Sequence, residues 1–310
     1  MRVTSNSYSE NLVTHFHTLA RRQLALQDQI ATGQRIRSAS DDPFAAQQVM
    51  QLRDESVANR QYQKNIGVHQ EFAQVTHGLM RNLQNRLDRA QEIAFTIDDL
   101  DSPEDLKAYA AEVNQLLEHA ADKISNAQHR GEFIFGGTKS DAIPFSIQRD
   151  AGGKITAVTY TGSSSTAESE IAPGVLVSSR VPGQGGGGEG GLFADSSSGA
   201  DIFAHLIALR DQIEAGDVSA IHSTTRDLLR ADEDNVLFHM AKNGALQARL
   251  ESSLSSAKDE NLALEHEISD RADIDMAEAI VRLNQQQTNY QAALQSAGSI
   301  MQLSLLSFLR

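Results

Sequence analysis

Apolar residues recur at alternating spacings of four and three over most of this chain, and this pattern constrains its fold more than any other feature. The spacing marks a narrow apolar stripe by which one α-helix meets one partner helix. The longest stripe runs through Val68, Phe72, Val75 and Leu79 and continues to Ile97. The helix that carries this stripe is expected to run from residue 43 to about residue 98. With about 56 residues it would be roughly 84 Å long. We therefore expect a mainly α fold, an elongated antiparallel helical rod or coiled coil formed by the N- and C-terminal halves.

Residues that start and stop helices separate these stripes. Gly33 ends the first helix, and Asp42 followed by Pro43 provides an N-cap and a favoured first helical position. Ser102 is the expected N-cap of a return helix, and Asp201 that of a later one. From about residue 217 to 270, and again to the C-terminus, the pattern is helical. The return helix after Ser102 follows so soon after the preceding one that the two are predicted to form an antiparallel hairpin.

Between these helices the apolar period changes to that of short strands separated by turn residues. Strands are expected at 133–137, 143–147, 154–160 and 171–177, and a Gly-rich loop at 182–191. The predicted domains are the terminal helices 1–40 with 271–310, a long-helix rod domain of 41–136 with 200–270, and a β-rich insertion of 137–199.

The first and last helices each carry one narrow apolar stripe, which neither can bury alone. We predict that they pair with each other. Their remaining faces are rich in Gln, Asn, Ser and Ala, which suits packing against like subunits through amide hydrogen bonds. A self-contained helical bundle is the alternative. The candidate inter-helix and subunit interface residues are Leu12, Phe16, Leu19, Leu26, Ile30, Ile280, Leu294, Met301, Leu305 and Phe308.

The charge of the chain is −14, and it is concentrated in the middle. Residues 1–40 and 270–310 together are near neutrality, which suits burial among copies, whereas the acidic middle repels nucleic acid and anionic membrane surfaces. The long charge-free run from Leu283 to Leu309 holds too many Gln and Asn residues for a membrane span. The chain starts without a recognisable secretory signal, and it contains no Cys, which excludes thiolate sites.

No residue pattern predicts catalysis. The loop at 183–191 lacks the Lys-Ser/Thr of a phosphate-binding loop and carries Glu189. His15 and His17 lie on different faces of a helix, and Glu265-His266-Glu267 lacks zinc-ligand spacing. The Asp and Glu clusters at 98–101 and 232–234 fit helix capping and solvation. We expect no catalytic, cofactor or metal site, and hence no enzyme.

Both ends of the chain resemble the flagellin superfamily. The N-terminal segment Ile30–Ile36 with Ser38–Pro43 is similar to one family signature, and Ala272–Ile280 with the ending Leu303–Leu309 to another. The segment Gly131–Lys139, with Pro144–Phe145 after it, resembles an element of the hook–filament junction members that flagellins generally lack. The likeness covers about 1–145 and 200–310.

The resemblance implies an extracellular structural subunit of the bacterial flagellum, exported by the flagellar type III apparatus without a cleaved signal peptide. The terminal helices would form an inner tube, the long helices a middle shell and the insertion the outer surface. Implied partners are like subunits in a ring, hook-associated protein 1, flagellin and a cytoplasmic export chaperone. Two alternatives remain open: flagellin itself, the bulk filament subunit, and a monomeric coiled-coil binding or scaffold protein.

Overall fold

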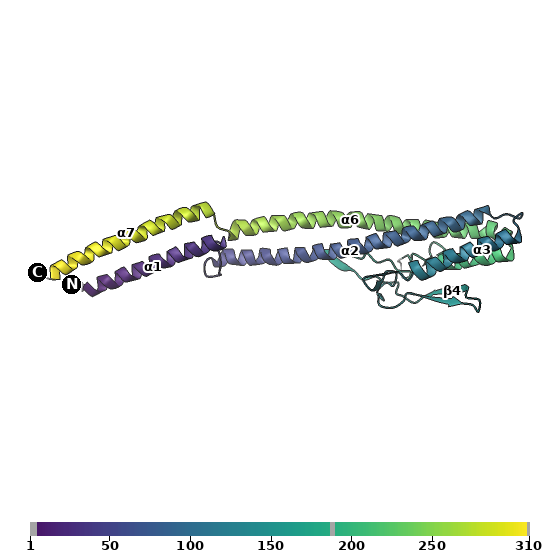
Figure 1. Ribbon diagram of the computed structural model, residues 1–310, viewed down its shortest axis with the longest axis horizontal. Coiled ribbons are helices and arrows are strands. Elements are labelled where there is room, and N and C mark those ends of the chain that lie inside the picture. Colours follow the sequence, from purple (N-terminus) through teal and green to yellow (C-terminus); the bar gives the residue numbers. More distant parts are fainter. Residues whose placement is uncertain (1–4, 187–189, 309–310) are drawn as a thin grey trace. The chain divides into compact units, whose positions relative to one another are not determined.

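The computed structural model is mainly α-helical and confirms the predicted fold class of long antiparallel helices with a small β-rich region (Figure 1). It describes residues 5–186 and 190–308, with side chains at 11, 13–186 and 190–299. The described helices are α1 (Ser5–Thr32), α2 (Pro43–Thr96), α3 (Pro103–Glu118), the π-helical turn η1 (His119–Ile124), α4 (Ile202–Ala215), α5 (Val218–Ala220), the π-helical turn η2 (Ile221–Thr225), α6 (Arg226–Ala272) and α7 (Met276–Phe308).

The expected helix boundaries are found close to where the capping residues placed them. The Asp42 carboxylate accepts a hydrogen bond from the Ala45 amide (3.1 Å) where α2 begins. Ser102 and Asp105 form a reciprocal capping box at the start of α3. Asp201 caps α4, and the left-handed residue Gly216 ends it. These short polar residues satisfy backbone groups that a helix end leaves without partners.

In the part of the β-rich region that the structure describes there are four separate antiparallel strand pairs, and the longest is the β3–β4 hairpin with Phe145 opposite Tyr160. The strand predicted at 133–137 is wrong beyond Phe133, because the following residues form a buried turn. The segment 171–177 is part of a hairpin that turns at Gly174 (φ 73°). The pairs are β1 (Gln128–His129) with β2 (Glu132–Phe133), β3 (Phe145–Arg149) with β4 (Ile155–Tyr160), β5 (Ser169–Ala172) with β6 (Val175–Val177), and β7 (Ala194–Asp195) with β8 (Ala200–Asp201).

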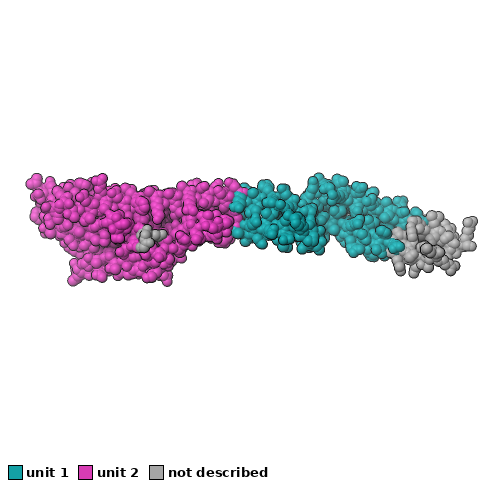
Figure 2. Space-filling model, turned by 180° about the vertical axis from the view of Figure 1, so that it is seen from behind, with its two compact units in different colours: residues 1–58, 260–310 teal, residues 59–259 magenta. Residues whose placement is uncertain are grey.

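The packing of the chain separates two compact units, which Figure 2 shows in different colours. Unit 1 comprises residues 1–58 and 260–310, and unit 2 comprises residues 59–259. This division differs from the three predicted domains, which stay a prediction.

Unit 2 contains the hydrophobic core. Helices α2, α3, α4 and α6 contribute Leu83, Val113, Leu206 and Val236, all completely buried, and the β-rich region adds Phe193. Within this unit α2 and α6 run antiparallel, since Gln91 of α2 donates to the Leu229 carbonyl (3.1 Å) and Gln247 of α6 to the Ala73 carbonyl (3.2 Å). Strand β4 lies against α4 and α3.

Candidate assembly surface

The two terminal signature segments lie against each other in unit 1. Gln34 and Asp273 form an antiparallel β-bridge. The Arg35 amide donates to the Ala272 carbonyl (2.7 Å), and the Ile274 amide donates to the Gly33 carbonyl (3.0 Å). Segments almost 240 residues apart in sequence therefore close one joint between α1 and α2 on one side and α6 and α7 on the other. The contact between these two segments is a physical reason for a family signature at each end of the chain.

The acidic residues of the joint order its backbone. The Asp41 carboxylate accepts hydrogen bonds from the amides of Arg37 (3.1 Å) and Ser38 (2.9 Å). The backbone hydrogen bond from Ser38, followed by that from Arg37, lowers the pKa of Asp41, because both stabilise its ionised form. Asp275 accepts from the Ala277 amide (2.9 Å) and so caps α7. The carboxylates of both signatures thus serve structure rather than chemistry.

Helices α1 and α7 lie side by side (Figure 1). The Phe16 ring meets the Tyr290 ring edge to face at 5.9 Å between centroids. Gln286 donates to the Leu19 carbonyl (3.5 Å). The α1 members of the predicted interface are half-buried where the structure describes their side chains: Phe16, Leu19, Leu26 and Ile30. The side chain of Leu12 lies outside the described residues.

The face that α7 turns toward the interior differs from the face that the sequence singled out. Ile280 and Leu294 are each 47% exposed, so neither is buried within one chain. The more buried positions lie one residue before these two and again follow the four-three spacing. They are Ala279, Leu283, Gln286, Tyr290, Ala293 and Ala297. The predicted members Met301, Leu305 and Phe308 have side chains outside the described residues.

Unit 1 leaves much apolar surface uncovered. Among the residues that the structure describes, it holds ten of the seventeen exposed large apolar side chains, although it contains only about a third of the chain. Its buried apolar residues are mostly alanines, and both core clusters belong to unit 2. The ten side chains are Val13, Leu24, Phe44, Met50, Val57, Leu262, Met276, Ile280, Val281 and Leu294.

A shallow groove lies between α1 and α7, beside these apolar side chains. It has a volume of about 430 Å³ and is lined by two arginines, Arg22 and Arg282, together with three glutamines and two apolar residues. Amides and guanidinium groups in a shallow groove can hydrogen-bond to another polypeptide, and the exposed apolar residues beside it can be buried at the same time. The arrangement favours binding of protein over binding of a small molecule.

The Gly131–Lys139 segment is a buried turn of unit 2. Phe135 is completely buried against Phe193, with the two rings edge to face at 5.1 Å. The Phe135 carbonyl accepts from the Gly183 amide (3.0 Å) and from the Tyr160 hydroxyl (3.0 Å). This segment therefore connects the β3–β4 hairpin and the Gly-rich loop to the core.

Catalytic and metal-binding groups were not expected, and within the described residues no cluster of three or more His, Asp or Glu side chains could hold a metal ion. None of the described helices offers an apolar stretch long enough for a membrane span. The buried ionisable pair in unit 2 is His205 with Asp232 (Nδ1 to Oδ2, 2.8 Å). Asp232 also accepts from the Asp201 amide (2.9 Å). The pair thus fixes the start of α4, where β8 ends.

Both ends of the chain match models of one known protein family. Residues 3–140 match the model of the bacterial flagellin N-terminal helical region, and residues 235–309 match that of the bacterial flagellin C-terminal helical region. Together these matches cover well over half of the chain. The chain belongs to the flagellin family. Gly33 lies in the first matched region and Asp273 in the second, so the joint between them links the two regions.

Individual relatives within the flagellin family carry hook-associated names. Flagellar hook-associated protein 3 of Escherichia coli (strain K12) is 24% identical over 292 residues, which is 90% of both chains. A structure from Vibrio parahaemolyticus, assigned as a flagellar hook-associated protein, covers 75% of this chain and 100% of its own (22% identity, TM-score 0.65). FlgL of Bacillus cereus covers 71% and 99% (18% identity, TM-score 0.56). The structural likenesses concern the fold.

Proposed function

We propose that this chain is a structural subunit of the bacterial flagellum that joins the hook to the flagellin filament. The uncovered apolar surface of unit 1 carries the proposal, because ten exposed large apolar side chains on so small a unit require neighbours. Membership of the flagellin family supports a flagellar location. The likeness to proteins named flagellar hook-associated protein 3 supports the junction.

In this proposal the subunit assembles in two steps. Within one chain, α1 and α7 pair through the half-buried residues around Phe16 and Tyr290. Between chains, the outward residues, among them Leu24, Ile280 and Leu294, pack against like subunits and form a ring. We assign Met301, Leu305 and Phe308 to the same interface on their spacing in the sequence. The ring then acts as a mechanical adaptor, with one side bound to hook-associated protein 1 and the other serving as template for the first flagellin subunits.

The proposal extends to export and location. An unassembled subunit with this much apolar surface is prone to self-associate too early, which a cytoplasmic flagellar export chaperone would prevent by covering the C-terminal helical region. The chain would leave the cell unfolded through the flagellar type III apparatus and function outside it. No enzymatic step belongs to this function.

Deletion of the gene tests the junction. We expect the deletion strain to build hooks and to release unpolymerised flagellin into the medium, and we expect the intact gene to restore filaments. A complementing gene with Ile280→Asp should fail to restore them, whereas Ser252→Asp, which adds the same charge on the exposed surface of unit 2, should succeed. Normal filaments on the deletion strain would rule out the junction role.

Stoichiometry separates the junction from the filament itself. A junction subunit should be scarce in sheared flagella compared with flagellin, because it forms one short zone, whereas a filament subunit should dominate. Quantitative mass spectrometry of sheared flagella measures this ratio. A chain that made up most of the sheared protein would be flagellin.

A further inference from the structure

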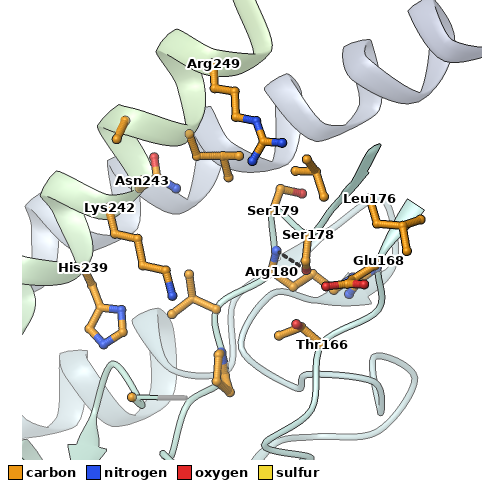
Figure 3. Close-up of a pocket in the computed structure, with 16 residues that line it drawn as sticks. Thr166, Glu168, Leu176, Ser178, Ser179, Arg180, His239, Lys242, Asn243 and Arg249 are labelled. Atoms are coloured by element: carbon orange, nitrogen blue, oxygen red, sulfur yellow. Dashed lines mark hydrogen bonds between the residues drawn. The ribbon is translucent and has the colours of Figure 1, made fainter. Parts of the chain in front are cut away.

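The structure contains a cleft in unit 2 that is not part of the proposed assembly surface. It lies between α6 and the β5–β6 hairpin with the segment that follows β6, and its volume is about 390 Å³. Figure 3 shows the side chains of Lys242, Asn243 and Arg249 extending from α6 toward Ser178 and Ser179 on the other side. Pockets that bind small molecules have volumes of about 300–1,000 Å³, so the cleft can hold a small ligand.

The cleft is cationic in a strongly acidic chain. Arg180, Lys242 and Arg249 line it, and Glu168 is the one carboxylate among its described lining residues. Arg180 already binds Glu132 and stacks on the Phe72 ring at 4.9 Å. Within the described part of the chain, Lys242 and Arg249 have no ion-pair partner. At a net charge of −14, two uncompensated cations at one cleft attract an anion.

Buried hydrogen-bonding groups at the cleft also lack partners. Asn243 lines the cleft and is 3% exposed, and its Oδ1 accepts from Gln247 Nε2 (2.6 Å). Among the described residues, Nδ2 has no hydrogen-bond acceptor. A buried amide donor without a partner destabilises the fold, so an acceptor in the cleft would remove this cost. The free group is a donor, which suits an oxyanion.

His239 completes the α6 side of the cleft. It lies four residues before Asn243 and hence on the same helical face, and it is 2% exposed. Neither ring nitrogen has a hydrogen-bond partner of good geometry among the described residues, although the Gly191 carbonyl lies near enough to influence the ring's charge. Burial, followed by the charge of Lys242, lowers the pKa of His239. The neutral ring therefore has one N–H donor and one acceptor nitrogen and adds no charge to the cleft.

We propose that this cleft binds a small oxyanion, a phosphate or carboxylate group of a free ligand. Lys242 and Arg249 supply the positive charge, and the Asn243 amide donates a hydrogen bond from the buried wall. Ser178 and Thr166 hydroxyls lie at the opposite wall, where they can bind further oxygens of the ligand. This site is independent of the terminal helices and of the proposed junction function.

Calorimetric titration of the full-length chain with inorganic phosphate and with acetate, in chloride buffers of equal ionic strength, tests the site. We expect saturable binding of one anion per chain, and the tighter of the two probes identifies the preferred group. Lys242→Gln and Arg249→Gln should each weaken binding by about fivefold. Both side chains are exposed, so the variants should fold. Lys258→Gln, a cation on the same helix outside the cleft, is the control and should leave binding unchanged.

Two results would overturn the proposal. One is the absence of saturable binding of either probe above the chloride reference. The other is an equal loss of affinity in the Lys258→Gln control. That result would mean that the anion is attracted by the surface charge of the helix as a whole and not by this cleft. If Lys242→Gln and Arg249→Gln instead reduced self-association in sedimentation experiments while neither probe bound, an acidic segment of another copy would be the occupant.

Discussion

At the scale of single residues, Gly137 shows how strictly one position can be constrained. Its φ is +63°, a left-handed conformation that residues with a Cβ rarely adopt. A Cβ at this position would lie 2.0 Å from the Ser163 carbonyl oxygen and 2.7 Å from that of Ser165. Both neighbours are backbone atoms, which cannot move aside without moving the loop. Gly137 is therefore a structural requirement of the Gly131–Lys139 segment.

Gly137→Ala should lower the free energy of unfolding by at least about 2 kcal/mol, since strain and steric conflict add. Urea unfolding followed by circular dichroism measures the loss. Gly78→Ala in α2 is the matched control, because a Cβ there meets open space, and alanine in a helix is favoured by up to about 1 kcal/mol. Equal stability of the Gly137→Ala variant and the unmodified chain would contradict this account of the turn.

The His205–Asp232 pair gives the stability of the chain a defined pH dependence. Burial opposes the charge of His205, but the hydrogen bond and charge of Asp232 outweigh it and raise the pKa of His205. Burial raises the pKa of Asp232, and His205 counteracts this only in part. A raised histidine pKa stabilises the fold fully below its ordinary value of 6.5, and this stabilisation is lost as the pH rises through the folded value.

We therefore expect the stability difference between the unmodified chain and His205→Gln to be largest below pH 6.5 and to shrink as the pH is raised above it. Thermal unfolding across this range measures both proteins. Burial lowers the pKa of His69 and His239, so these residues contribute a stability that rises with pH. Both proteins contain them, so the difference between the two proteins isolates the effect of His205. A difference that grows with pH would contradict the assigned direction.

At the scale of elements, α7 has two apolar faces with separate tasks. One face carries Ala279 and Tyr290 toward α1, and the other exposes Ile280 and Leu294. Small residues on the inner face allow close approach of the two helices, and the larger outer residues can only be buried by another molecule. Intrachain pairing and assembly should therefore respond to different substitutions.

Phe16→Ala should weaken the α1–α7 pair by about 1–2 kcal/mol, because it removes a half-buried ring and its contact with Tyr290. Hydrogen exchange of the α1 amides should become faster in the isolated chain. Ile280→Asp should leave this exchange unchanged and should reduce assembly, measured by sedimentation at high concentration. The prediction fails if both variants accelerate exchange equally, since Ile280 would then belong to the intrachain contact.

At the scale of the whole molecule, the two units differ in what stabilises them. Unit 2 has its own core, whereas the buried apolar residues of unit 1 are mainly alanines. Burial of a larger side chain contributes about 1.5–3 kcal/mol, so unit 1 gains much less from folding alone. Its helices should open locally at low cost in the isolated chain.

Mild proteolysis of the isolated chain should remove roughly the first 40 and the last 40 residues, and a fragment containing unit 2 should persist. Mass spectrometry of the products identifies the cleavage sites. Incorporation into an assembly should protect both ends. Termini that resist protease in the monomer would instead favour the scaffold alternative, in which the ends need no neighbours.

Local signals in the sequence determined most of the helices and their limits. Ser102 and Asp201 could be recognised as caps because their effect depends only on the next few residues. The four-three stripe of α1 runs through Phe16 and Leu19, and both side chains are half-buried in the structure. The strands β1, β7 and β8 were missed, because two residues are too few to show alternation.

Only the tertiary structure decided which face of α7 meets α1, how the Gly33 and Asp273 segments join, and where a cationic cleft lies. Ile280 and Leu294 are the more apolar residues, but close helix approach selected the smaller Ala279 and Ala297 for the interior. Lys242 and Ser179 are distant in sequence, and only the fold brings their elements together. Local propensity acts within a few residues, whereas packing depends on partners that no local pattern specifies.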